Sequence, residues 1–153
     1  MPTRPRSVPL SDPNKRNLVA EVSIREPRVF NRGCSPRILA FDCGMKYNII
    51  RYLARKGVEL TVVPYDFDVD AAGGIGQWDG VFVSNGPGDP SMAGATIATL
   101  RKLIAPAFAP VSDRAAAAKV TPIFGICLGN QLLALATGAS TFKMKYGNRG
   151  MNQ

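Results

Sequence analysis

A cysteine flanked by glycines is the residue of this chain best placed to do chemistry. Cys127 lies in the sequence FGICLGNQ (124–131), after an apolar run and before a helix-forming run at 132–136. Strand, sharp turn and helix in that order form a nucleophile elbow, with Cys127 where a serine hydrolase carries serine. Gly125 and Gly129 lack Cβ atoms, so strand and helix can pack closely around a strained residue. At a helix N-terminus the macrodipole and free N–H groups favour a thiolate, so we predict a nucleophile rather than a buried structural cysteine.

The 153 residues contain no histidine. A thiol nucleophile usually works with a histidine base, so the sequence offers a nucleophile without its partner. Cys34 and Cys43 have no comparable setting, and we interpret both as structural. Three widely spaced cysteines, no C-x-x-C pair and no histidine predict reduced thiols and no metal site.

A second glycine-rich turn, Gly-Pro-Gly-Asp-Pro at 86–90, follows another short apolar run. Proline and glycine could simply mark the end of a strand. Alternatively, the rigid backbone could point N–H groups into a cleft as an oxyanion hole, with Gly86 and Gly88 allowing close approach by a ligand. The residues alone leave both interpretations open. Asp89 is typical of a helix cap rather than of a catalyst.

Two further groups of polar residues lie near the elbow in sequence. Gln131 follows Cys127 by four residues, so its amide could bind a small polar substrate or could be a solvated helix residue. Lys143, Lys145 and Arg149 indicate an exposed basic strand and loop.

Apolar runs and helical periodicity alternate along the chain, which predicts an α/β fold with an open, mostly parallel sheet and flanking helices. In such sheets the functional loops lie at the carboxyl ends of the strands, where both glycine-rich turns fall. We predict a largely irregular leader or linker at 1–36, in which 18–24 could form a short strand, and a domain at 37–153. Within the domain we expect strands at 38–41, 59–64, 81–83 and 121–126, helices at 46–56, 95–104 and after the elbow, a loop at 66–79, and a surface connection or helix extension at 105–120.

Charge and hydropathy exclude some classes of partner. The net charge is +8, but residues 1–37 carry eight basic and three acidic side chains, and no basic-aromatic stripe follows, so we expect no nucleic acid. No apolar run approaches the roughly 18 residues of a membrane span. The arginine-bearing, acid-free start is typical of organelle presequences, whereas its prolines favour a flexible linker. We therefore expect a cytoplasmic protein, with a mitochondrial one as the alternative.

Together these motifs resemble the class I glutamine amidotransferases. Four stretches look like the small, glutamine-hydrolysing subunit or domain of carbamoyl-phosphate synthetase, and the resemblance runs from about Asp12 to Gln153. The stretches are FDCGMKYNIIRYL (41–53), VFVSNGPGDP (81–90), PIFGICLGNQLLALATGA (122–139) and KMKYGNRGMNQ (143–153).

The resemblance implies a catalytic role for Cys127, which would attack the glutamine carboxamide to give a γ-glutamyl thioester and ammonia. It implies that the backbone amides of Gly86 and Leu128 form an oxyanion hole and that Gly88 and Gln131 also contact the glutamine. It implies no cofactor in this chain. The partner would be the large synthetase subunit or domain, where ATP and magnesium act and the ammonia and bicarbonate become carbamoyl phosphate for pyrimidine or arginine synthesis.

The chain departs from the family pattern in two ways. Asn130 stands where many relatives have histidine, next to the nucleophile but not acting as its base. The family's catalytic histidine and glutamate lie beyond the point that matches Gln153, so we expect weak or no turnover by this chain alone. We also expect an uncovered sheet edge and apolar surface, and hence aggregation or dependence on a partner. The alternatives are a truncated, non-catalytic module that binds the synthetase partner, and an amidotransferase subunit of another biosynthetic enzyme.

Overall fold

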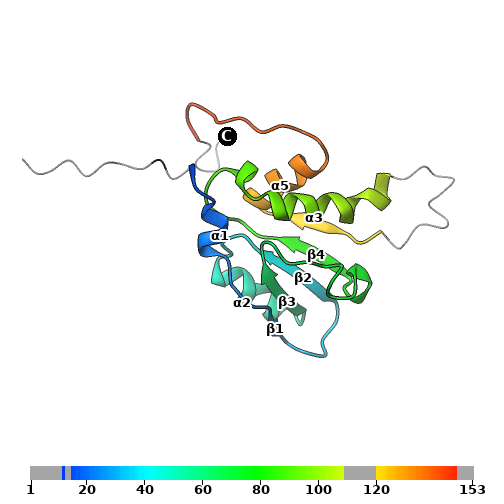
Figure 1. Ribbon diagram of the computed structural model, residues 1–153. Helices are drawn as coiled ribbons and strands as arrows, with labels where there is room; N and C mark the ends of the chain where they lie inside the picture. Colours follow the sequence, from blue (N-terminus) through cyan, green and yellow to red (C-terminus); the bar gives the residue numbers. More distant parts are fainter. Residues whose placement is uncertain (1–11, 13–14, 109–119, 148–153) are drawn as a thin grey trace, which may run out of the picture.

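A five-stranded sheet organises residues 12, 15–108 and 120–147, the part of the chain that the computed structural model describes (Figure 1). Its strand order is β1-β3-β2-β4-β5, and only β1 runs antiparallel to its neighbour. This arrangement confirms the predicted open, mostly parallel α/β sheet. The strands are β1 (Arg28–Phe30), β2 (Arg37–Asp42), β3 (Glu59–Pro64), β4 (Gly80–Val83) and β5 (Ile123–Gly125).

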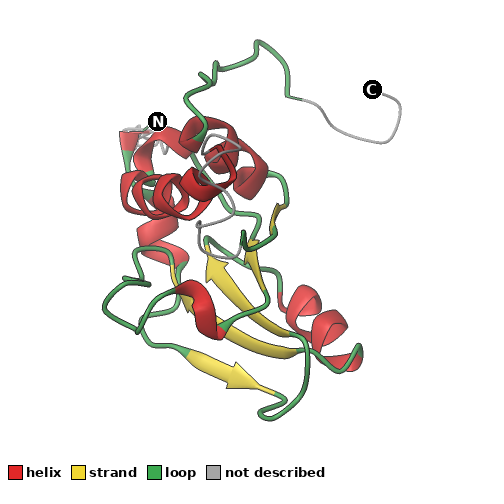
Figure 2. Ribbon diagram, turned by 90° about the vertical axis from the view of Figure 1, so that its right-hand side faces the viewer, coloured by secondary structure: helices red, strands yellow, loops and turns green. Residues whose placement is uncertain are grey.

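Helices cover both faces of the sheet (Figures 1 and 2). Successive strand residues point to opposite faces. Leu39 therefore packs with the side chains of α3 and α5, while Ala40 packs on the face that α2 covers. The helices are α1 (Leu18–Val22), α2 (Tyr47–Arg55), α3 (Gly94–Ile104) and α5 (Leu128–Ala136), with short 3₁₀ turns η2 (Ile75–Gln77), η3 (Pro90–Met92) and η4 (Ala105–Phe108).

The central strands are buried on both faces, which explains why they read as short apolar runs in the sequence. All four residues of β4 are buried, and so is most of β2. The strands expected at 38–41, 59–64 and 81–83 and the helices expected at 46–56 and 95–104 are confirmed, with no end shifted by more than one residue. The strand expected at 121–126 is shorter, because only Ile123–Gly125 pair with β4.

The segment before β2 is more regular than the sequence predicted. The strand considered at 18–24 is wrong: Leu18–Val22 form a helix, because the Asn17 side chain accepts the Ala20 N–H (3.1 Å) as an N-cap and Val19 enters the core. Arg28–Phe30 then pair with β3 at the sheet edge. Of the connection expected at 105–120, the first residues form η4, and 109–119 lie outside the described residues.

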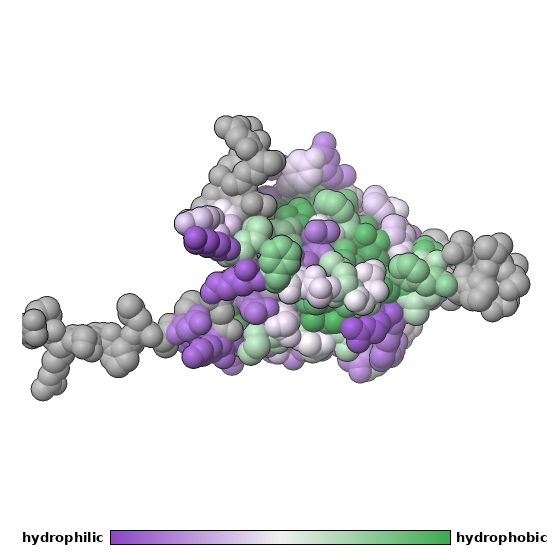
Figure 3. Space-filling view, turned by 90° about the horizontal axis from the view of Figure 1, so that it is seen from above, coloured by the Kyte–Doolittle hydropathy of each residue, from purple (hydrophilic) through white to green (hydrophobic). Residues whose placement is uncertain are grey.

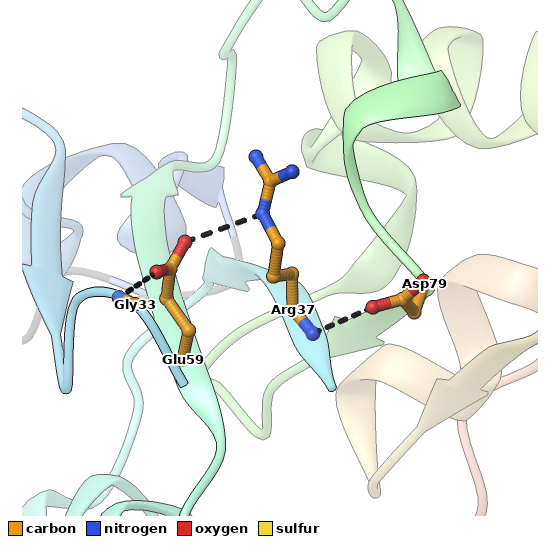
Figure 4. Close-up of polar contacts among 4 residues, drawn as sticks. All are labelled: Gly33, Arg37, Glu59 and Asp79. Carbon is orange, nitrogen blue, oxygen red and sulfur yellow. Dashed lines mark hydrogen bonds and ion pairs between the residues drawn. The ribbon is translucent and has the colours of Figure 1, made fainter. Parts of the chain in front are cut away.

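A polar cluster aligns the amino-terminal ends of the strands (Figure 4). The Glu59 carboxylate accepts the Gly33 N–H and pairs with the Arg37 guanidinium at 3.3 Å. The Arg37 N–H donates to Asp79 just before β4 (2.8 Å). Surface pairs of this kind contribute at most about 1 kcal/mol each, so the cluster sets register more than stability. It lies at the opposite end of the sheet from the two glycine-rich turns.

Apolar surface lies open beside β5, on the face that α2 covers only in part. Phe124 is 64% exposed, and its ring lies 6.2 Å from that of Phe82. A groove of about 420 Å³ runs from here to Leu53 of α2. Viewed from the side of α3 and α5, hydrophobic side chains also gather over the middle of the molecule (Figure 3). None of the described helices is both long and apolar enough to cross a membrane.

Exposed apolar surface at a sheet edge favours self-association. We expect Phe124→Lys to lower the fraction of oligomer in sedimentation velocity several-fold, because it places a charge in the groove. Phe108→Lys is the matched control, since Phe108 is 70% exposed but lies on η4 and does not line the groove. A wild-type chain that sediments as a monomer at high concentration would contradict this prediction.

Candidate active site

Cys127 occupies the turn between β5 and α5. Its φ of 53° and ψ of −109° place it outside the regions that L-residues ordinarily adopt, a conformation that costs about 1–3 kcal/mol. The residue is exposed, and its carbonyl accepts the Gln131 N–H in the first turn of α5 (3.2 Å). Strand, strained cysteine and helix follow one another as the sequence predicted, so the elbow geometry is confirmed.

The two elbow glycines are required by backbone contacts. A Cβ added to Gly125 would lie 2.5 Å from the carbonyl carbon of Gly129. A Cβ added to Gly129 would overlap the carbonyl oxygen of Val83, at the end of β4. Any side chain at either position would push α5 away from the sheet, so the sequence expectation about these glycines holds.

The turn after β4 reaches the start of α5. A Cβ on Gly86 would overlap the carbonyl oxygen of Cys43 and lie 2.6 Å from Cδ2 of Leu128, so the Gly86 backbone is in contact with both. Within the described part of the chain, the backbone N–H groups of Gly86 and Leu128 donate no hydrogen bond. The fold therefore brings the Gly86 backbone against Leu128, the residue that follows Cys127, and the backbone N–H groups of both are uncommitted.

A pocket of about 460 Å³ lies one helical turn from the elbow. Gly88, Asp89 and Pro90 form one side, and Gln131 and the segment after α5 (orange to red in Figure 1) form the other. The structure thus brings Gly88 and Gln131 to the same pocket. Cys127 does not line it, but its carbonyl oxygen accepts the backbone N–H of Gln131, which does.

Asp89 acts as a cap, as the sequence predicted. Its carboxylate accepts the Ser91 N–H (2.9 Å) and the Ser91 hydroxyl (2.7 Å) at the start of η3. These bonds, with a smaller contribution from Lys143, hold the pKa of Asp89 below its usual value.

Lys143 and Lys145 are exposed, but their segment forms no strand, because it pairs with no strand of the sheet in the described residues. Arg149 lies outside them.

Sequence reasoning missed three polar residues at the carboxyl ends of β2 and β4. Asp42 is only 6% exposed, and Ser84 is fully buried. Together with Asn85 they hydrogen-bond the backbone around both loops. The signal that could have revealed them is their position, because polar residues that follow buried parallel strands lie at the functional edge of the sheet.

The other cysteines differ from Cys127 in environment. Cys43 is completely buried in the core, and burial, together with the adjacent Asp42, raises the pKa of its thiol to about 12. Cys34 is exposed rather than packed in the core. Among the described residues, no three histidine, cysteine or acidic side chains are grouped as metal ligands would be.

Comparison with known proteins places the chain in a family. The model of the class-I glutamine amidotransferases matches residues 39–153, so the chain belongs to this family. It is 50% identical to Multifunctional protein CAD of Squalus acanthias over 99% of this chain and 6% of the relative. It is 46% identical to the carbamoyl phosphate synthase arginine-specific small chain of Saccharomyces cerevisiae, over 95% of this chain and 33% of the relative.

A third relative is the mitochondrial carbamoyl-phosphate synthase [ammonia] of Aquarana catesbeiana, 44% identical over 93% of this chain and 8% of the relative. The resemblance to carbamoyl-phosphate synthetases that the motifs indicated is confirmed. The chain spans a third or less of the length of these three curated relatives.

The three thiols should differ in reactivity because they differ in exposure. Iodoacetamide at pH 8 should alkylate Cys34 and Cys127 in the native chain, while Cys43, protonated and enclosed, should react at least about 100-fold more slowly. Peptide mapping by mass spectrometry, with and without urea, measures the three rates. Equal rates at Cys43 and Cys34 without urea would show that the core is not formed.

The raised pKa of Cys43 also predicts a pH dependence. A raised folded-state pKa gives a stabilisation that is complete below the ordinary value of 9.0 and is lost as pH rises toward 12. The urea midpoint should therefore fall more steeply over this window in the wild type than in Cys43→Ala. Parallel pH profiles for the two proteins would contradict the assignment.

Proposed function

We propose that this chain supplies the nucleophile and the oxyanion-binding part of a glutamine-hydrolysing site that delivers ammonia for carbamoyl-phosphate synthesis. The observation that carries the proposal is Cys127 at a strained elbow, followed by Leu128, whose N–H is uncommitted and whose side chain contacts Gly86, a second uncommitted donor. Family membership supports it, and so does the identity shared with relatives named for carbamoyl-phosphate synthesis. Such an activity fits an amidotransferase that works with a synthetase subunit or domain.

In the proposed reaction the Cys127 sulfur attacks the carbonyl carbon of the glutamine side chain. A carbon–sulfur bond forms while the carbonyl π electrons move onto oxygen. The N–H groups of Gly86 and Leu128 would bind the resulting oxyanion. One such donor is worth about 3–4 kcal/mol of transition-state stabilisation, because it is oriented before charge develops.

The tetrahedral intermediate then collapses as the carbon–nitrogen bond breaks. The nitrogen takes up a proton and leaves as ammonia, and the enzyme is left as a γ-glutamyl thioester. Water attacks the thioester carbon, the carbon–sulfur bond breaks, and glutamate and the free thiol are released. Gly88 and Gln131 would hold the rest of the glutamine. The Gln131 amide can both donate and accept, which suits a substrate with an ammonium and a carboxylate.

These 153 residues contain no histidine, so they offer no imidazole for the proton-transfer steps. Loss of one member of a catalytic triad typically costs about 10⁴-fold or more in turnover. We therefore propose that the chain by itself forms the covalent adduct but releases ammonia very slowly. ATP and magnesium would act in the synthetase partner and not in this chain.

A non-catalytic role is the second candidate. Two observations favour a module that only binds a synthetase partner. These 153 residues contain no histidine, and the chain is 44% identical to a relative named carbamoyl-phosphate synthase [ammonia]. In that case Cys127 would have no special reactivity toward glutamine analogues. The two candidates therefore differ in one measurable property of a single thiol.

The test uses a chloroketone analogue of glutamine, in which the carboxamide is replaced by a group that loses chloride when a thiolate attacks it. We expect one adduct in the intact mass, located at Cys127, because binding next to the sulfur raises the effective concentration of the electrophile. The rate should exceed that of the exposed Cys34 by at least about tenfold, and L-glutamine should slow it.

Two controls define the outcome. Cys127→Ser should show no fast adduct, and the D-enantiomer of glutamine should give no protection. Modification of Cys127 at the rate of Cys34, without protection by glutamine, would favour the non-catalytic module. Ammonia release at ordinary enzyme rates from the chain alone would contradict the expected lack of a base.

A further inference from the structure

Asn85, the residue immediately before Gly86, hydrogen-bonds the neighbouring loop with both the nitrogen and the oxygen of its side-chain amide. Asn85 Nδ2 donates to the carbonyl oxygen of Gly44 (3.0 Å), and its Oδ1 accepts the Lys46 N–H at 3.4 Å. Both partners belong to the turn between β2 and α2. A solvated surface asparagine would not use its donor and its acceptor on the backbone of one turn.

The turn between β2 and α2, which Asn85 contacts, is itself fixed by hydrogen bonds to Asp42. The buried carboxylate of Asp42 accepts the N–H groups of Gly44 (2.8 Å) and Met45 (2.7 Å) with one oxygen. Its other oxygen accepts the Ile24 N–H (3.0 Å), which joins the turn to the segment that follows α1. Three backbone donors on one carboxylate make this turn a rigid anchor.

A second residue ties the same strand ends together. The Ser84 hydroxyl accepts the Cys43 N–H (2.9 Å) and donates to the Asn85 carbonyl oxygen (2.8 Å). Both residues that precede Gly86 are therefore bonded to the end of β2 or to the turn after it. Ser84 is fully buried, whereas Asn85 is half-buried at the loop, so Asn85 is the one that can be changed without opening the core.

The backbone of Gly86 is fixed by close contacts. It contacts the Cys43 carbonyl and Leu128, and a Cβ on Gly44 would lie 2.9 Å from Cδ of Pro87. The Gly86–Pro87 backbone thus lies against the same turn that Asn85 holds. The direction of the Gly86 N–H is set by how this turn and the end of β4 are joined.

We propose that Asn85 is a positioning residue for the oxyanion hole: by bridging Gly44 and Lys46 it orients the Gly86 N–H toward the oxygen of the tetrahedral intermediate. The inference rests on the proposed function. Donors stabilise a transition state only if they are oriented in advance, and a displacement of about 1 Å can cost roughly 100-fold. Loss of the bridge should therefore weaken binding of the tetrahedral species more than binding of glutamine.

The probe is a glutamine analogue in which an aldehyde replaces the carboxamide. The Cys127 sulfur adds to the aldehyde carbon, the carbonyl π electrons move onto oxygen, and the thiol proton is passed to solvent or to that oxygen. The reversible hemithioacetal needs no leaving group and no histidine. Protection of Cys127 against iodoacetamide, read by peptide mapping, gives dissociation constants for the aldehyde and for L-glutamine.

Asn85→Ala should weaken aldehyde binding about 10- to 100-fold and change the dissociation constant of glutamine by less than about threefold. Asn85→Asp keeps the acceptor for Lys46 but cannot donate to Gly44, so it should show the same split. Asn48→Ala is the matched control, because it removes an exposed asparagine whose side chain, among the described residues, hydrogen-bonds only Arg51 on α2. The iodoacetamide rate at Cys127 without ligand should be equal in all four proteins.

The outcomes distinguish failure of the proposed function from failure of the positioning role of Asn85. If the wild type binds the aldehyde no more tightly than glutamine, the proposed function fails. If the wild type binds it tightly and both Asn85 variants do so equally well, only the positioning role is overturned. If Asn85→Ala melts below the assay temperature, Asn85→Asp, which preserves the side-chain volume, decides the question.

Discussion

Backbone packed directly against backbone at the carboxyl ends of β2, β4 and β5 is the constraint on which the rest of the site depends. Gly125 and Gly129 bring α5 onto the end of β4, and Gly86 brings the next loop onto Cys43 and Leu128. Since no Cβ fits at these three positions, the loops cannot separate without losing the contacts between α5 and the sheet. The strain at Cys127 is sustained by this packing, which holds the residue from both sides.

Burial on both faces of the central strands supplies the stability that such packing needs. The core of β2 and β4 fixes where the strands end, and the polar cluster of Arg37, Glu59 and Asp79 fixes where they begin. Site and cluster therefore lie at opposite ends of the same rigid strands. The arrangement separates the residues that set register from those that we propose to contact glutamine, which lie at the edge where functional loops of parallel sheets are found.

The sequence predicted the central strands and the elbow because their signals are local: short apolar runs, and glycines spaced around a cysteine. It mispredicted 18–24 because alternating apolar residues fit a short strand, while the Asn17 cap and the burial of Val19 favour a helix. It missed β1, whose residues are mostly exposed and pair only at an edge. The roles of Asp42 and Asn85 were not visible because their partners Ile24 and Gly44 lie 18 and 41 residues away.

The described residues divide the proposed chemistry into two parts. Attack on a carbonyl and binding of the oxyanion depend on Cys127, Gly86 and Leu128, which the sheet edge brings together. Proton transfer to the leaving nitrogen requires an acid or base, and these 153 residues contain no histidine to act as one. Because backbone donors need no titration, the first part of the proposed chemistry would depend only on formation of the elbow and the turn after β4. If the proposed function holds, turnover would depend on a proton donor brought to Cys127, which would make ammonia release separable from reactivity of the thiol.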